Sequence, residues 1–184
     1  MKPALLLPLL LVMLFLSVGI QDMLPEIPPS KERIQLLPVV FCFGVLALPL
    51  LPALFFALTT AVVQGLLLLQ VQAGQAEFGL TWTVVFFLCW AILLQMTSET
   101  THGMRWELHA LGSALVTLTL LGGEFVMLCI VRGGFPLDQA ALLRIAVPSA
   151  AALLIAPLLY LMLRSLVPLS QEGSQTAKQP DFNR

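Results

Sequence analysis

Charged residues are scarce in this sequence. Asp, Glu, Lys and Arg make up only 10% of its 184 residues, whereas hydrophobic residues make up 59%. A soluble domain carries about 25% charged residues, so most of this chain has no surface suited to water. The sequence therefore predicts an all-α integral membrane protein, a bundle of about six transmembrane helices. We expect one transmembrane helical domain over residues 1–169 and a polar, disordered tail over residues 170–184.

Basic clusters and paired cysteines are also missing. The net charge is -1, which argues against nucleic acid as a partner because phosphate binding needs clustered Lys and Arg. The three cysteines, Cys42, Cys89 and Cys129, lie in apolar runs and share no Cys-x-x-Cys spacing. We expect all three to be small buried hydrophobic side chains rather than disulfide partners or metal ligands.

Long apolar runs dominate what is present. A helix crosses a bilayer in about 20 residues, and the predicted segments are 3–20, 36–50, 52–71, 80–96, 110–131 and 145–163. The first is interpreted as an uncleaved anchor, although Ser17 and Gly19 also fit a signal-peptide cleavage site. Pro49 and Pro52 predict that the run over 36–71 forms two short helices that meet in a tight turn. One long, kinked helix is the alternative.

Polar segments between these runs predict loops. Residues 21–33 contain three prolines and should be extended. Residues 97–109 should form a solvated interfacial loop, and residues 133–138 a turn. Pro148 and Pro157 should bend the last helix. Five basic residues on one side against four on the other favour cytoplasmic termini.

The loop over 97–109 is the strongest candidate for a catalytic or metal site, because it contains Glu99, His102, Glu107 and His109. It lacks the His-Glu-x-x-His spacing that places two imidazoles on one helical face. Ser98 also lacks a Gly-x-Ser-x-Gly context. We therefore expect no catalytic, cofactor or metal site. The few polar residues within the spans, such as Gln64, are better explained by helix–helix hydrogen bonds than by a transport path.

A row of small residues follows the third apolar segment. It consists of Ala53, Ala57, Ala61 and Gly65, each four residues after the last. Small residues at this spacing let helix backbones approach closely in lipid. We expect a close helix contact here, with a partner or within the protein's own core. Chance in an alanine-rich helix is the alternative.

Glu124 is a carboxylate inside an apparent membrane span, where a charge costs about 2.5–3.5 kcal/mol. At 1.5 Å per residue it should lie about 12 Å deep, and Arg144 of the next helix about 8 Å deep. We predict that these two residues pair across the fifth and sixth helices, with Gly122 and Gly123 permitting close approach. A contact with a partner's transmembrane helix, a protonated glutamate and an ion path are the alternatives.

The layout resembles the MreD family of bacterial rod shape-determining membrane proteins over residues 3–167. In that family the third helix tends to end in Gly-Leu-Leu-(apolar)-Asp, followed by a Gly-Leu pair. Here "VQGLLLLQVQAGQAEFGL" (63–80) matches at Gly65–Leu68 and Gly79–Leu80, but Leu69 or Gln70 stands where the family often has Asp. The final helix, "IAPLLYLMLRSL" (155–166), is also similar to the family's ending.

The resemblance implies a non-enzymatic, cofactor-free, multi-pass protein of the bacterial cytoplasmic (inner) membrane. It would act in lateral cell-wall synthesis and cell shape, surrounded by membrane lipid and bound to the bitopic protein MreC. MreB, RodA and the elongation-specific penicillin-binding protein would be looser partners. The family's fold is similar to the substrate-binding subunits of energy-coupling-factor vitamin transporters, which is the alternative function. Those subunits carry Ala-xxx-Ala in their first helix, whereas residues 3–20 contain only Ala4.

Overall fold

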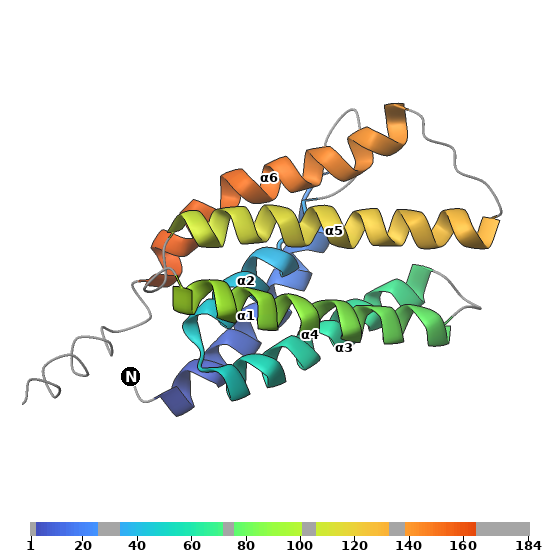
Figure 1. The fold of residues 1–184 in the computed structure, drawn as a ribbon. Helices are drawn as coiled ribbons and strands as arrows, with labels where there is room; N and C mark the ends of the chain where they lie inside the picture. The colour runs from blue at the N-terminus through green and yellow to red at the C-terminus, as the bar shows by residue number, and fades with distance from the viewer. Residues whose placement is uncertain (1–2, 26–33, 72–75, 101–105, 133–138, 165–184) are drawn as a thin grey trace, which may run out of the picture.

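The structure is a computed structural model that describes residues 3–25, 34–71, 76–100, 106–132 and 139–164. Within these ranges all regular secondary structure is helical (Figure 1). The helices are α1 (Pro3–Met23), α2 (Leu37–Ala47), α3 (Leu50–Val71), α4 (Ala76–Thr100), α5 (Trp106–Arg132) and α6 (Gln139–Arg164). The predicted turn over 133–138, the tail over 170–184 and most of the loop over 21–33 lie outside the described residues.

Two helices, rather than one kinked helix, form from the long apolar run over 36–71. The break falls at Leu48, whose backbone is extended with φ -100° and ψ 150°. Leu48 precedes Pro49, and the residue before a proline is disfavoured in helical conformation. Pro52 then lies in the first turn of α3, where a missing N–H costs little. The prolines therefore position the break, as predicted.

The second helix is shorter than the predicted segment and is enclosed by the others. Its 11 residues rise about 16 Å, against about 30 Å for the hydrocarbon core of a bilayer. On its own, α2 is therefore about half as long as the hydrocarbon core is thick, and its crossing of the membrane stays a prediction. Every residue from Leu37 to Leu46 is buried, and α2 contacts each of the other five helices.

Side chains of neighbouring helices bond to backbone groups at both ends of α2. The Leu36 N–H at its N-terminal end donates to Gln21 Oε1 of α1, at 3.1 Å. At its C-terminal end, Gln95 Nε2 of α4 donates to the carbonyl oxygens of Val45 and Leu48, the latter at 2.8 Å. Helix ends leave backbone groups unpaired, and apolar surroundings offer no water to satisfy them. Two glutamines thus allow a short helix to end inside the bundle.

Four of the remaining helices form two antiparallel pairs around α2, and α1 packs against α2 and α3. The α3–α4 pair and the α5–α6 pair each pack extensively, whereas α4 and α5 touch only sparsely. In Figure 1 the α5–α6 pair lies above α2 and the α3–α4 pair below it. α6, which contains Pro148 and Pro157, curves along its length. One hydrophobic cluster includes residues of all six helices.

Three helices are long and apolar enough to cross a membrane, among the residues that the structure describes. These stretches are Thr81–Ser98, Trp106–Met127 and Gln139–Leu163. The apolar stretches Leu6–Gln21, Leu37–Ala47 and Leu50–Leu66 are shorter. The helical fold and these three stretches fit a membrane protein, and six crossings stay a prediction.

Both ends of the predicted loop over 97–109 are helical, which corrects that prediction. α4 continues to Thr100, and α5 begins at Trp106; residues 101–105 lie outside the described ranges. Thr97 Oγ1 donates to the Leu93 carbonyl oxygen one turn earlier, at 2.5 Å. A side chain that bonds its own helix in this way is compatible with continuation of the helix. The polarity of residues 97–109 therefore led us to place the end of α4 too early and the start of α5 too late.

Candidate functional site

The row of small residues on α3 faces the interior of this protein. Ala53, Ala57 and Ala61 have no exposed surface, and Gly65 is also buried. Phe56, Thr60 and Gln64 share the buried face, whereas Phe55, Leu58 and Val62 on the other face are exposed. We expected the row to contact either a partner or the protein's own core. In the structure it faces the core.

Glu124 and Arg144 lie on α5 and α6, the two helices that were predicted to pair as antiparallel neighbours. The helices run side by side over much of their length (Figure 1). The Glu124 carboxylate is half-buried, with its Oε1 atom shielded from solvent, and Arg144 is exposed. The ion pair between them stays a prediction.

The two glycines before Glu124 do not have the role that was predicted for them. A Cβ atom added to Gly122 would meet no described atom within 4 Å. A Cβ atom added to Gly123 would lie 2.8 Å from Cζ2 of Trp82, which belongs to α4. The sequence suggested that Gly123 lets α5 and α6 approach each other closely. In the structure, the ring of Trp82 from α4 packs against Gly123 instead.

Several hydroxyl groups on the helices bond their own backbone. Thr60, Ser113, Thr117 and Ser149 each donate to the carbonyl oxygen four residues earlier, at 2.7–2.8 Å. This arrangement satisfies a buried hydroxyl without a second helix. These four hydroxyl protons are thus used within single helices.

His109 is a core residue that the sequence analysis misplaced in a loop. It has no exposed surface, and its Nε2 lies 3.1 Å from the Val39 carbonyl oxygen of α2. Its ring is edge-on to Phe43 and tilted against Tyr160, with a centroid distance of 5.8 Å in each case. His109 thus joins α5 to α2 and α6. The signal in the sequence was the four-residue spacing of His109, Ser113 and Thr117, which places them on one face of a helix.

Burial separates the three cysteines. Cys42 and Cys129 are buried as predicted, but Cys89 is exposed, which corrects the third prediction. All three thiols are free. No group of three or more His, Cys, Asp or Glu side chains is arranged to hold a metal ion in the part of the chain that the structure describes.

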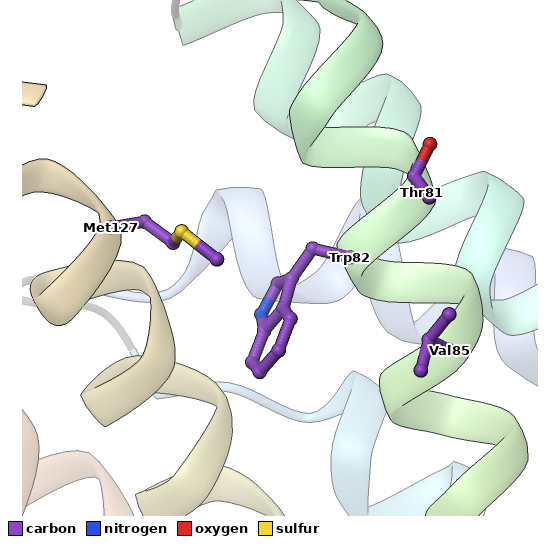
Figure 2. A pocket seen from close by; sticks show the side chains of 4 residues that line it. All are labelled: Thr81, Trp82, Val85 and Met127. Carbon is purple, nitrogen blue, oxygen red and sulfur yellow. The ribbon is translucent and has the colours of Figure 1, made fainter. Parts of the chain in front are cut away.

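A small groove opens between α4 and α5. It encloses about 170 Å³ and is lined by Thr81, Trp82, Val85 and Met127 (Figure 2). The indole of Trp82 projects from α4 toward α5, and Met127 lies across from it. Sites for small molecules typically enclose about 300–1,000 Å³, so this groove suits a group smaller than a vitamin.

Comparison with known proteins adds no relative: no family model, curated protein or solved structure matches this chain.

Proposed function

We propose that this chain is a non-catalytic component of the bacterial lateral cell-wall synthesis machinery that binds an MreC-like bitopic protein in the cytoplasmic membrane. The proposal rests on the resemblance to the MreD family. The third helix of the structure, α3, ends at Val71. The stretch Gly65–Leu68 falls in its last turns, which supports the resemblance.

One observation favours a protein that works by helix packing over a transporter. It is that side chains of the same chain already bond to the ends of α2. In many transporters, the ends of broken helices at mid-membrane point at the substrate or the coupling ion. Here Gln21 and Gln95 of the same chain bond to the ends of α2. Short-helix ends that already bond to side chains of the same chain have less need of a ligand, which supports a role in helix packing.

Capture of partners from native membranes tests the proposal. The tagged chain is crosslinked in its host with a reversible reagent, solubilised and purified, and its companions are identified by mass spectrometry. A tagged membrane protein of similar size and abundance serves as the control. We expect specific enrichment of a bitopic wall-synthesis protein, together with loss of rod shape when the chain is depleted.

Two results would contradict the proposal. Enrichment of transporter ATPase subunits, or a vitamin that copurifies in stoichiometric amount, would favour the energy-coupling-factor alternative. Enrichment of no wall-synthesis protein with unchanged cell shape on depletion would overturn a role in elongation altogether.

A further inference from the structure

His109 is a titratable side chain enclosed at the junction of three helices. It belongs to α5 and has no exposed surface. From α2, Val39 bonds to the ring and Phe43 packs edge-on against it. From α6, the ring of Tyr160 is tilted against it. The imidazole therefore has protein atoms on every side, so its surroundings are those of a protein core whatever encloses the bundle.

The hydrogen bonds of His109 determine which protonation state fits the junction. Nε2 lies 3.1 Å from the Val39 carbonyl oxygen, which can only accept, so Nε2 carries the hydrogen. Nδ1 is buried and has no hydrogen-bond partner among the described residues. The Ala156 carbonyl of α6 also faces the ring, without completing such a bond. A neutral ring needs one acceptor and an imidazolium needs two, so this geometry fits the neutral ring.

The titratable groups that face the junction do not offset a charge on His109. Tyr160 contacts the ring from α6, and from α2 the Cys42 thiol lies within hydrogen-bonding distance of Ser113. Phenols and thiols are neutral in acid. Glu107 of α5 is exposed, and two residues along a helix point to nearly opposite sides. Burial of an unpaired charge is costly, so protonation of His109 opposes the packing around it.

We propose that His109 is an acid-sensitive latch, which joins α5 to α2 and α6 while its ring is neutral and releases them when the ring is protonated. In the latched state Nε2–H donates to Val39, and the ring lies against Phe43 and Tyr160. In acid, the new Nδ1–H has no aligned acceptor, and the imidazolium gains hydration only by leaving the junction. This latch is independent of the partner that the chain binds.

The pH dependence of stability measures the latch. In the unfolded chain a histidine has a pKa of about 6.5, whereas the latched ring stays neutral. Above pH 6.5 both states leave the ring unprotonated, and below it the unfolded state binds one more proton, so stability falls as the pH falls. Between pH 8 and pH 5 the unfolding equilibrium constant should rise about 30-fold from this group. Urea unfolding in nonionic micelles, followed by tryptophan fluorescence, measures the change.

A variant of each histidine separates His109 from other titrating groups. His109→Gln keeps an N–H donor but does not titrate, so it should lose the 30-fold component, about 2 kcal/mol. His102→Gln changes the other histidine of the sequence and should retain it. Wild-type stability that is the same at pH 8 and pH 5 would overturn the latch, as would an equal pH response in His109→Gln.

A direct view of the ring needs no change at His109 and applies even if His109→Gln does not fold. In His102→Gln labelled with ¹⁵N-histidine, His109 gives the only histidine signals. At pH 8 we expect a neutral ring with its proton on Nε2. At pH 5 the folded protein should still show the neutral ring, with the charged form confined to the unfolded population. A charged ring in the folded protein at pH 5 would overturn the latch.

Discussion

The two halves of this bundle are held together differently. In the half that contains α2, aromatic side chains of several helices meet: Phe41 packs edge-on against Phe87 at 4.8 Å, and Phe43 contacts both His109 and Tyr160. The other half is the part of the bundle that α2 does not reach. There, Trp82 of α4 packs closely against Gly123 of α5. Because α2 is too short to extend through the whole bundle, the half that contains it is densely packed, whereas the other half has a groove.

The difference shows how a short buried helix organises a membrane bundle. In lipid, association of helices depends on packing and hydrogen bonds rather than on the hydrophobic effect. α2 supplies packing on all sides, and Gln21 and Gln95 supply hydrogen bonds at its ends. Segments that α2 does not reach lack its packing and its two glutamine bonds, and regions with few buried contacts open more readily.

The largest effect should come from removing an aromatic ring in the α2 half. Phe56 has no exposed surface, and its ring lies against the backbone of Gly44 in α2. Phe56→Ala should lower the free energy of unfolding by about 3 kcal/mol, the lower end for buried Phe truncations, because lipid replaces part of the lost burial. Phe55→Ala, at a neighbouring position that is 54% exposed, is the control and should change little. Unfolding of both variants by SDS in mixed micelles measures the difference, and equal losses would contradict it.

Loss of a capping glutamine should have the next largest effect. Gln95→Leu keeps a similar volume but removes the donor to the Val45 and Leu48 carbonyl oxygens. Leaving a buried acceptor unsatisfied costs about 1–3 kcal/mol, so we expect a loss of about 2 kcal/mol. Thr97→Val, which removes a bond on the exposed side of the same helix, is the control. Equal stability of Gln95→Leu and the wild type would show that α2 does not need this cap.

The predicted pair of Glu124 and Arg144 should have a smaller effect, because Arg144 lies on the surface of the bundle and its long side chain can extend toward the head groups and water. Exposed pairs contribute about 0–1 kcal/mol, and breaking a buried pair costs about 3–5 kcal/mol. We therefore expect Glu124→Leu to cost about 1–2 kcal/mol, and the added change Arg144→Leu to restore stability. A double variant that is no more stable than the single one would exclude the pair. A double variant that folds but captures no partner would make the carboxylate a docking group.

The two adjacent glycines of α5 provide the finest test of the half beyond α2. Replacing a helical glycine by alanine typically gains about 0.5–1 kcal/mol. Gly122→Ala should show this gain, because the added methyl meets no described atom within 4 Å. Gly123→Ala should show less or none, because its methyl displaces the Trp82 ring. Paired unfolding curves measure the difference, and identical gains would indicate that the ring does not pack on Gly123.

Much of the fold could be predicted from hydropathy and proline positions. The break before Pro49 follows from the local geometry of proline, and it was placed within a few residues. The length of α2 could not be predicted, because its ends depend on Gln21 and Gln95, which are distant in sequence. Hydropathy alone cannot distinguish a helix buried by other helices from one buried by lipid.

The candidate site was harder to predict than the fold. The small residues of α3 lie together on a buried face, as their spacing indicates, and a close helix contact there stays a prediction. Gly123 was assigned to the wrong neighbour, because a glycine indicates a close approach but not which side chain approaches. His109 was assigned to solvent because the residues before it are polar, although a bond to Val39 holds it in the core.

Distances between spin labels test the difference between the two halves most directly. With the native cysteines replaced by alanine, one label pair is placed at Leu93 and Leu111 in the α2 half, where Leu94 contacts Gly112. The other pair is placed at Thr81 and Met127, across the groove. We predict a narrow distance distribution for the first pair and a clearly broader one for the second, in lipid nanodiscs. Equally narrow distributions, or a broader one in the α2 half, would contradict the claim that α2 makes its half of the bundle the more rigid one.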